Sequence, residues 1–162
     1  MSDDRTYTGR LTLRKATKED TRVLYEWRND PLTKENSIDS KPVGWDVHVE
    51  WVKRTLQGDV AGRTLYIAET DGCPVGTVRT DEGEDGYTEI SYTVAPAWRG
   101  RGLGKDMVLL CAHTAVRGKK LRARIKKGHG PSEAIAAALG LAPVFEEASA
   151  DPSDTRPVVE WR

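Results

Sequence analysis

The feature that most constrains this chain is a glycine-rich, basic segment, Arg99-Gly100-Arg101-Gly102-Leu103-Gly104-Lys105. In the residues before it, 88–94, apolar side chains recur at every second position, which predicts a strand. The apolar spacing after it predicts a helix that begins near Gly102. The three glycines let the backbone turn tightly and approach a ligand closely. Because the amides and dipole of a helix start attract anions, and the segment is basic, it predicts a pyrophosphate-binding loop.

Two common nucleotide-binding motifs fit this segment poorly. A Walker A loop needs a hydroxyl where Asp106 stands and a glycine where Arg99 stands, and a dinucleotide fingerprint needs G-x-G-x-x-G early in the chain. The pattern that fits is [RQ]-x-x-G-x-[GA], which is met by Arg99, Gly102 and Gly104 after a strand that ends in Val94-Ala95-Pro96. This arrangement resembles the acyl-CoA loop of the GNAT superfamily of N-acyltransferases. A glycine-rich surface turn is the alternative interpretation.

Length and composition are those of one ordinary domain. The chain has 162 residues, of which 38% are hydrophobic and 31% charged, with a net charge of zero, so no overall charge favours nucleic acid. Residues 1–9 are polar and are expected to form a mobile tail before a single domain over residues 10–162. The chain shows no membrane span and no signal-peptide pattern, and Cys73 and Cys111 are expected to be free thiols. We therefore expect a cytoplasmic protein that contacts no membrane and binds no metal.

The hydrophobic periodicity and the turn residues predict a definite order of elements. The expected strands are 11–13, 64–69, 73–80, 88–94, 121–126, 143–146 and 158–161, and the expected helices are 17–29, 45–57, one from about 102, and 132–139, with Ser132 as its cap and a loop over residues 30–43. This order resembles the GNAT superfamily over essentially the whole chain. The resemblance implies an α/β (α+β) fold with a mixed, mostly antiparallel sheet of about six to seven strands and about four helices, splayed at a bulge.

A second, looser resemblance lies near the start of the chain. Leu13-Arg14-Lys15-Ala16, the segment 26–30, Asn36-Ser37 and the segment 45–48 resemble GNAT members that acetylate nucleotide-linked aminosugars. Ribosomal-protein N-terminal acetyltransferases share a similar opening. The resemblance implies an acetyl-CoA-dependent N-acetyltransferase whose acceptor is a primary amine of a small, nucleotide-linked or phosphorylated molecule. The alternatives are a protein N-terminal or lysine acetyltransferase, a non-catalytic acyl-CoA-binding module, and an acyltransferase for modified nucleic acid.

The same resemblance implies where acetyl-CoA binds. The backbone of Tyr92, Thr93 and Val94 would pair with the pantetheine arm, where the strand separates from its neighbour. The pyrophosphate would meet the loop formed by Arg99, Gly100, Arg101, Gly102, Leu103, Gly104 and Lys105. Free amides there would also polarise the thioester carbonyl.

The proton-transfer groups are less well defined. Many family members place a general base near Glu89, and His48 is a second candidate, because imidazole titrates in the right range; both residues also fit ordinary surface positions. The general acid is a gap, since Ala136 stands where the family usually has a tyrosine and His129 lies near the place of a common asparagine. Water, Tyr87 or Tyr92 would substitute, or the thiolate would leave unassisted.

The predicted strand 121–126 carries a clue to the acceptor. Leu121, Ala123 and Ile125 point one way, whereas Arg122, Arg124 and Lys126 point the other. The basic face predicts either a cleft for a phosphate-bearing acceptor, with Arg124 as a contact, or ion pairs with the acidic residues Glu146 and Glu147. Trp27 and Trp51 would either line the acceptor cleft or pack in the core. In this family the short terminal strands sometimes mediate dimers, so the chain is expected to be a monomer or a homodimer.

Overall fold

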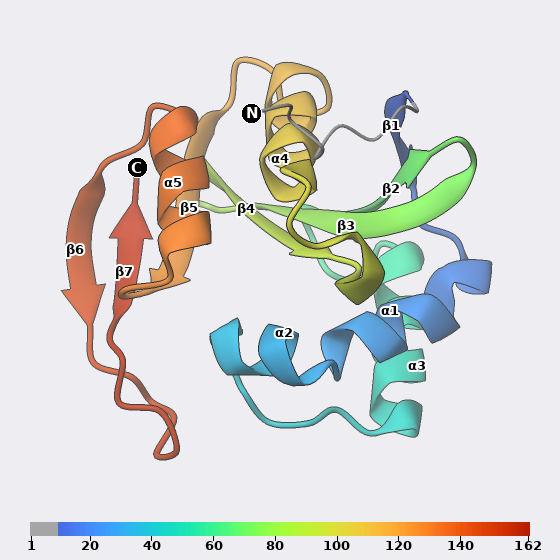
Figure 1. Ribbon diagram of the computed structural model, residues 1–162, viewed down its shortest axis with the longest axis horizontal. Coiled ribbons are helices and arrows are strands. Elements are labelled where there is room, and N and C mark those ends of the chain that lie inside the picture. The colour runs from blue at the N-terminus through green and yellow to red at the C-terminus, as the bar shows by residue number, and fades with distance from the viewer. Residues whose placement is uncertain (1–9) are drawn as a thin grey trace.

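A seven-stranded sheet runs through residues 10–162, the part of the chain that the computed structural model describes (Figure 1). The strands lie in the order β1-β2-β3-β4-β5-β7-β6. Their bounds are β1 Leu11–Lys15, β2 Arg63–Thr70, β3 Cys73–Glu82, β4 Tyr87–Val94, β5 Lys120–Lys126, β6 Pro143–Glu147 and β7 Val158–Trp161. All seven expected strands are therefore confirmed, and the tail expected over residues 1–9 lies outside the described residues.

The helices fall where the apolar spacing predicts, with one addition. They are α1 Thr21–Arg28, α2 Pro31–Asn36, α3 Trp45–Leu56, α4 Leu103–His113 and α5 Gly130–Ala138, with 3-10 turns at Lys18–Asp20 and Pro96–Trp98. Residues 30–43, expected as a loop, contain α2. Asp30 caps this helix by accepting a hydrogen bond from the Thr33 amide at 3.1 Å, and Pro31 occupies its first position.

The expected cap of the last helix is wrong. Ser132 lies inside α5, whose N-cap residue is His129, because the helix begins two residues earlier at Gly130. Pro131 near the helix start is compatible with this earlier beginning, since proline lacks only an amide that would have no partner there. The Ser132 hydroxyl is thus free to bond elsewhere.

Most of the sheet is antiparallel, as expected. β1, β2, β3 and β4 form an antiparallel set, and the Asp71-Gly72 turn between β2 and β3 has positive φ at both residues, 51° and 75°. β4 and β5 are the parallel pair, and β7 returns antiparallel to both β5 and β6. The register between β3 and β4 runs without a shift from Gly76↔Val94 to Glu82↔Thr88, so no bulge in this pair causes the splay of the sheet.

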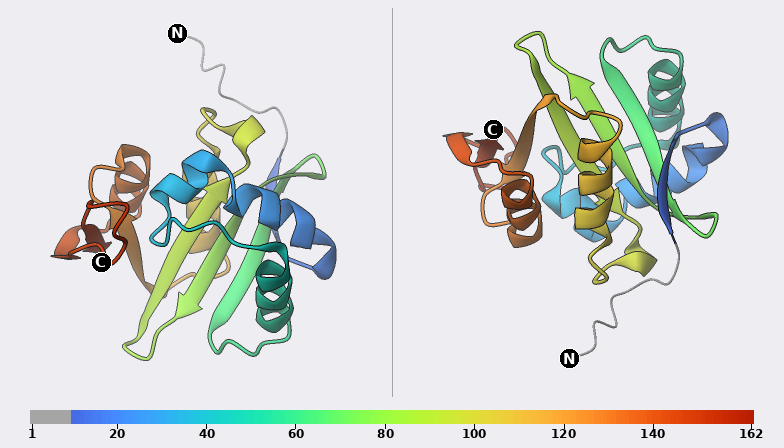
Figure 2. Two further views of the ribbon diagram at one scale, coloured as in Figure 1. Left: turned by 90° about the horizontal axis from the view of Figure 1, so that it is seen from below. Right: turned by 90° about the horizontal axis from the view of Figure 1, so that it is seen from above.

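The helices cover the two faces of the sheet unequally. α4 packs on one face, whereas α1, α2 and α3 lie on the other, and α5 lies beside β5 (Figures 1 and 2). The core under α4 is built from Val78, Ile90, Leu103, Met107 and Cys111, among others. The second core joins α1 and α3 to β2. These two layers fix the position of β4, which leads from the middle of the sheet into the glycine-rich loop.

Candidate active site

The glycine-rich loop joins the end of β4 to the start of α4 by a turn that only glycine adopts without strain. Gly100 and Gly102 have φ of 77° and 75°, and a side chain at either position would project into open space. The amide of Asp106 bonds to the Gly102 carbonyl at 3.3 Å, as the first full helical turn closes. The amides of Leu103, Gly104 and Lys105 precede that turn and have no carbonyl four residues back within the helix. They gather at the positive end of the helix dipole.

Gly104 has a different role from the other glycines of the loop. A Cβ atom built on Gly104 would lie 2.9 Å from Tyr92 Cε2, 3.3 Å from Val94 Cγ2 and 3.4 Å from Ile135 Cδ1. The missing side chain therefore lets the first turn of α4 pack directly against β4 and α5. The sequence motif is thus explained by helix packing at Gly104 and by backbone conformation at Gly102.

The basic side chains of the loop are used in different ways. Arg99 bonds to the carboxylate of Asp30 and to the Thr33 hydroxyl, the latter at 3.0 Å. The guanidinium of Arg101 lies over the ring of Trp98, 4.7 Å from its centroid. Lys105 is exposed on α4. Positive charge therefore surrounds the amides of the helix start, and one of the cations also links the loop to α2.

The sheet opens next to this loop. β4 and β5 pair only at Tyr87↔Lys120, Thr88↔Leu121 and Glu89↔Arg122, after which β5 continues to pair with β7 and β4 with β3. From Ile90 to Val94, the edge of β4 that faces β5 has lost its partner strand. Such an edge presents amide and carbonyl groups to which an extended ligand can hydrogen-bond like an added strand. Tyr92, Thr93 and Val94, expected to bind pantetheine, lie on this edge.

The side chain of Tyr92 reaches from β4 to α5. Its hydroxyl lies 3.0 Å from the hydroxyl of Ser132, and burial raises the pKa of Tyr92. Ala136, one turn further along α5, is 2% exposed and packs with Ala123 and Ile125 of β5. By contrast, Tyr87 lies at the paired end of β4, where the Arg162 guanidinium covers its ring at 4.6 Å. Of the two tyrosines considered as proton donors, Tyr92 is the one on the open edge.

Glu89 lies where the two strands part. It is the last residue of β4 that pairs with β5, and it faces away from Ile90 and Tyr92, which pack under α4. Its carboxylate is half-buried, with Oε1 3.4 Å from Nε of Arg122. Arg122 is also bonded to Asp85, so the guanidinium is shared between two carboxylates. Glu89 thus combines partial exposure with a position at the apex of the opening.

His48 is not at the surface. It is 4% exposed between α1 and α3, and its Nε2 lies 2.9 Å from the Thr21 carbonyl, to which it donates a hydrogen bond. The rings of Tyr25, Trp45 and Trp51 surround it, with centroids 5.4 to 6.3 Å away. Burial lowers the pKa of His48, which favours neutral imidazole. These contacts explain His48 as part of the packing between the two helices.

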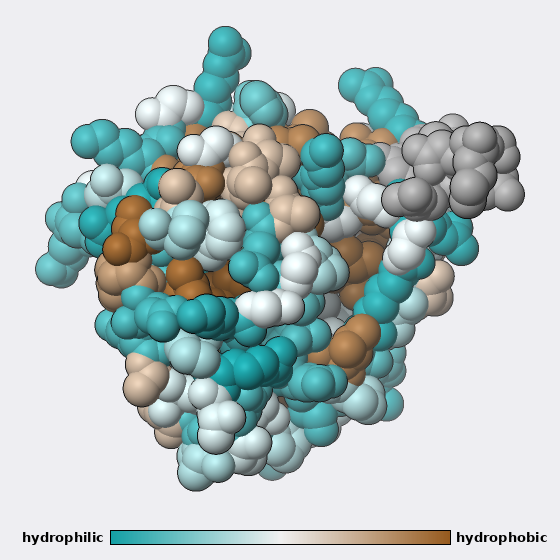
Figure 3. Space-filling view, turned by 60° about the vertical axis from the view of Figure 1, so that its left-hand side comes forward, coloured by the Kyte–Doolittle hydropathy of each residue, from teal (hydrophilic) through white to brown (hydrophobic). Residues whose placement is uncertain are grey.

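The basic face of β5 is matched by carboxylates. Arg124 Nη2 lies 3.8 Å from Glu147, Lys127 lies 3.1 Å from Glu146, and the buried Lys126 lies 2.7 Å from Asp154. These ion pairs agree with the interpretation that the strand pairs with the acidic end of the chain. The side of the molecule that carries β5, β6 and β7 is mostly hydrophilic, with apolar side chains exposed between the charged ones (Figure 3).

Trp27 is a core residue. It is 6% exposed and packs with Leu24, Val52 and Ile67 in the core under α1 and α3, while Trp51 is partly buried against the same core. One edge of Trp27 borders a shallow pocket between α1 and the turn after β4, which Ala95 and Trp98 also line. Packing thus explains its burial.

Two features are absent from the residues that the structure describes. Among the residues that the structure describes, no group of three or more His, Cys, Asp or Glu side chains is arranged to hold a metal ion. No helix within residues 10–162 is both long and apolar enough to cross a bilayer.

A sheet splayed between β4 and β5, with an amide-rich loop at its open end, defines an α/β fold of the acyltransferase class. Residues 10–142 match the family model described as acetyltransferase (GNAT) domain, and the chain belongs to this family. A search of curated proteins gave no match.

Several solved structures share the fold at low sequence identity. Spermidine N-acetyltransferase from Vibrio cholerae, in complex with CoA and spermine, has a TM-score of 0.80 at 14% identity, covering 93% of each chain. RimL, the ribosomal L7/L12 alpha-N-protein acetyltransferase in complex with coenzyme A, has a TM-score of 0.77 at 16% identity, covering 96% of this chain and 93% of that one. Ribosomal-protein-alanine N-acetyltransferase from Brucella melitensis has a TM-score of 0.75 at 22% identity, covering 93% and 97%.

Proposed function

We propose that this acetyltransferase uses acetyl-CoA to acetylate a primary amine of a small molecule. The observation that carries the proposal is the continuity of two features. The unpaired edge of β4 over Ile90–Val94 leads directly into a loop whose amides collect at the start of α4. An extended arm that ends in a diphosphate matches this surface, because the edge offers strand-like hydrogen bonds and the helix start attracts phosphate.

The loop would hold the diphosphate mainly through its backbone. The amides of Gly102, Leu103, Gly104 and Lys105 would donate to phosphate oxygens, while Arg101 and Lys105 supply positive charge. The backbone of Tyr92, Thr93 and Val94 would hydrogen-bond to the pantetheine arm. The guanidinium of Arg99 already contacts Asp30, so we assign that side chain to positioning the loop.

The chemistry then needs three proton transfers, because the ammonium nitrogen loses two protons on its way to the amide and the sulfur gains one. An amine is an ammonium at neutral pH, so a base must take a proton before the nitrogen attacks the thioester carbon. We assign this step to Glu89, directly or through water, and not to His48, whose Nε2 donates to Thr21 inside the helix interface. As the C–N bond forms and the C–S bond breaks, the thiolate must be stabilised. We propose that the Tyr92 hydroxyl donates its proton to that sulfur, and that the second proton lost by the nitrogen passes through water to restore the phenol, so that one proton is released overall.

A nucleotide-linked aminosugar, the acceptor expected from the basic strand, is less well supported than a small amine in general. Arg122, Arg124 and Lys126 each have a carboxylate partner, so their charges are neutralised within the protein. A phosphate-bearing acceptor would have to displace these partners or bind elsewhere. We therefore propose a small amine and leave its phosphate content to experiment.

Cys73 and Cys111 are both free thiols, which suits the reducing cytoplasm expected from the sequence.

Calorimetry and a turnover assay test the proposal together. Purified protein is titrated with acetyl-CoA and with adenosine as a control ligand that lacks the diphosphate. The protein is then mixed with acetyl-CoA and a panel of polyamines, aminosugars, nucleotide-linked aminosugars and a short peptide with a free N-terminus. The expected result is acetyl-CoA binding and CoA release with a small amine.

Each other outcome has a definite meaning. Failure to bind acetyl-CoA would overturn the proposal. Binding without CoA release from any amine would indicate a non-catalytic acyl-CoA-binding module. Release with the peptide alone would replace the small-molecule acceptor by a protein N-terminus.

A further inference from the structure

The short helix α2 lies across the open end of the splayed strands. In Figure 2 it crosses over the space between β4 and β5, on the face of the sheet opposite α4. The helix has only six residues, Pro31–Asn36, and so short a helix is unstable by itself in water. Its position must therefore come from contacts with the rest of the domain. Those contacts lie at its two ends.

The first contact links α2 to the glycine-rich loop. Asp30 accepts from the Thr33 amide at 3.1 Å and also from Arg99, whose guanidinium bonds to the Thr33 hydroxyl at 3.0 Å as well. The Asp30 carboxylate thus caps α2 and pairs with the loop at once. We call the contact of Arg99 with Asp30 and Thr33 the loop anchor.

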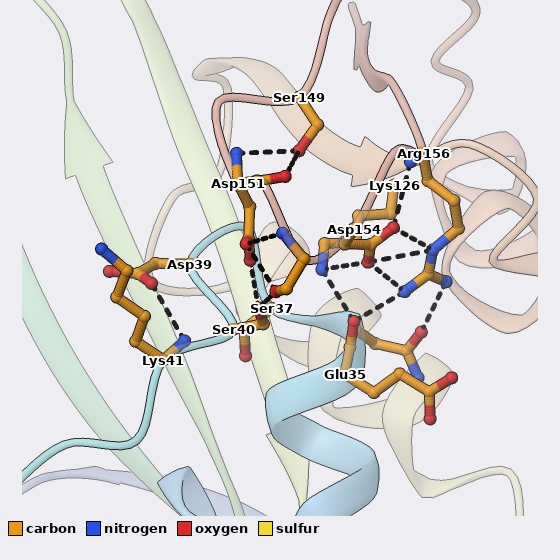
Figure 4. A network of polar contacts seen from close by, with 12 residues as sticks. Glu35, Ser37, Asp39, Ser40, Lys41, Lys126, Ser149, Asp151, Asp154 and Arg156 are labelled. Atoms are coloured by element: carbon orange, nitrogen blue, oxygen red, sulfur yellow. Dashed lines mark hydrogen bonds and ion pairs between the residues drawn. The ribbon is translucent and has the colours of Figure 1, made fainter.

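The second contact links the other end of α2 to β5 and to the segment before β7 (Figure 4). The Glu35 carbonyl accepts hydrogen bonds from Lys126 Nζ and from Arg156 Nη2, both at 2.7 Å, and Arg156 Nη1 donates to Asn36 Oδ1 at 3.2 Å. Carbonyls in the last turn of a helix lack an amide partner, and cations stabilise the negative end of the helix dipole. Two cations therefore satisfy the end of α2.

Asp154 joins these two cations into one cluster. Its Oδ2 lies 2.7 Å from Lys126 Nζ and 2.7 Å from Arg156 Nη2. Lys126 is 1% exposed, and a buried ammonium is costly unless its partners are complete. Both cations together hold the pKa of Asp154 far below its usual range. We call the set of Lys126, Asp154 and Arg156 the strand anchor.

A further bond extends the strand anchor along the chain. Ser40, in the segment after α2, bonds to Asp151, which also accepts from the Ser153 hydroxyl at 2.6 Å. The segment after α2 and the segment between β6 and β7 are thus joined at more than one point. Together with Glu35, Ser153 and Arg156, Ser40 also lines a shallow polar pocket at the surface. The end of α2 and the segment that follows it are therefore bonded to the segment that leads into β7.

We propose that the loop anchor and the strand anchor make α2 a fixed wall of the acceptor opening, and that their residues determine which amines are accepted. This inference rests on the proposed function, because it concerns the acceptor side of the same site. A fixed wall limits the width of an amine that can reach the thioester. When the strand anchor is broken, α2 is held at one end only. Wider amines then enter more easily, and narrow amines are positioned less well.

The test uses Arg156→Ala and, as a control, Lys127→Ala. Arg156 contacts the end of α2 directly, whereas Lys127 follows β5 and forms an exposed pair with Glu146. Both substitutions remove one cation from neighbouring positions, since Lys127 follows β5 and Arg156 precedes β7, the strand that pairs with β5. The probes are propylamine and naphthylmethylamine, each with acetyl-CoA. Arg156→Lys is a third variant, which keeps the charge but loses the forked contacts.

In the Arg156→Ala protein, we expect amide hydrogen exchange to accelerate jointly over residues 31–41 and 148–157. The ratio of kcat/KM for naphthylmethylamine to kcat/KM for propylamine should rise by about fivefold or more, while the affinity for acetyl-CoA changes by less than about twofold. Lys127→Ala should leave both the exchange pattern and the ratio unchanged. Arg156→Lys should fall between the two.

The negative outcomes can be told apart. Unchanged exchange in Arg156→Ala would show that the strand anchor does not hold α2. Accelerated exchange with an unchanged ratio would show that α2 does not select the acceptor, and either result overturns the inference. If the parent protein acetylates no amine, the proposed function fails and the selectivity inference falls with it, whereas the exchange measurement still reports on the anchor itself.

Discussion

Arg99, in the glycine-rich loop, donates a hydrogen bond to the carboxylate of Asp30, the residue that caps α2. The two residues are far apart in the sequence, and neither alone indicates the other. The pairing fixes the loop relative to the helix that crosses the opening of the sheet. The loop therefore has two connections, one through its amides to the proposed diphosphate site and one through Arg99 to the acceptor side.

Substituting Gly104 by alanine should disturb both folding and cofactor binding. The added Cβ would lie 2.9 Å from the Tyr92 ring and 3.3 Å from Val94, so β4 or α4 must shift. Overpacking of this kind costs about 1–3 kcal/mol of unfolding free energy. Urea denaturation and acetyl-CoA titration of Gly104→Ala would show lower stability and weaker binding.

Gly44→Ala is the matched control for that experiment. Gly44 has φ of −71°, and nothing lies within 4 Å of a Cβ built there, so alanine should change the unfolding free energy by less than about 1 kcal/mol. Equal behaviour of the two variants would contradict the close packing of α4 on β4.

The strand and helix order could be predicted because hydrophobic periodicity and turn residues determine it locally. The Asp71-Gly72 turn and the Gly102 start of α4 are examples, since each needs a backbone conformation that few residues adopt. α2 is absent from the expected elements because Asn29-Asp30-Pro31 also fits the end of the helix expected over residues 17–29. The same residues carry the signal of a helix start, an aspartate cap followed by proline.

The partners of charged residues could not be predicted, because they depend on tertiary contacts. Lys126 alternates with apolar residues like any exposed strand residue, yet it is buried against Asp154 and the Glu35 carbonyl. His48 was expected to be either a catalytic or a surface residue, and its burial depends on the packing of α1 on α3. The bond between Tyr92 and Ser132 likewise joins two elements whose proximity no local pattern reveals.

Glu89→Gln tests the base. If Glu89 accepts the ammonium proton, the amide should lower kcat by about 10²–10⁴-fold. Arg122 keeps its bond to Asp85 in this variant, so the fold should be maintained. Steady-state kinetics across pH provide the measurement.

Glu82→Gln is the control for Glu89, because Glu82 is an exposed carboxylate on the adjacent strand, 3.1 Å from Lys119. Its kcat should match that of the parent. A Glu89→Gln enzyme with the kcat of the parent would rule out this carboxylate as the base.

Tyr92→Phe tests the proton donor. Burial raises the pKa of Tyr92, so the phenol remains protonated at neutral pH and can donate. Removing the hydroxyl should lower kcat by about 10- to 100-fold and leave the acetyl-CoA dissociation constant nearly unchanged, since the ring is retained. Tyr87→Phe, at the paired end of β4, should keep kcat within about twofold of the parent. A loss of stability without a loss of kcat in Tyr92→Phe would indicate a structural role only.

His48 should make the protein less stable in mild acid. Burial lowers the pKa of His48 in the folded state, whereas the unfolded chain titrates near its ordinary value. Between these two pKa values, the unfolded state therefore binds more protons than the folded state. The free energy of unfolding is highest above about pH 6.5 and declines as pH falls from there to the folded pKa, by at most about 1.4 kcal/mol per pH unit for one group.

The measurement compares urea unfolding of the parent, His48→Gln and His113→Gln between pH 5 and pH 8. The slope below about pH 6.5 should become shallower in His48→Gln and remain in His113→Gln, because His113 is exposed at the end of α4. Burial also lowers the pKa of His129, which contributes equally to all three proteins, so their difference isolates His48. Identical slopes in the parent and His48→Gln would contradict the buried, neutral imidazole.

The two cysteines should differ sharply in reactivity toward a thiol reagent. Cys73 is exposed at the start of β3, whereas Cys111 is fully buried between α4 and the sheet, and burial raises the pKa of its thiol to about 11. Because the thiolate is the reactive form, Cys111 should react only when the protein unfolds. In the folded protein, one thiol per chain should thus react rapidly with the reagent, and a second thiol per chain should react only in denaturant. Cys73→Ser should abolish the rapid phase, and two rapid thiols in the parent would contradict the packing of α4. This difference also makes Cys73→Ser the suitable background for measuring CoA release, because its remaining thiol is hidden from the reagent.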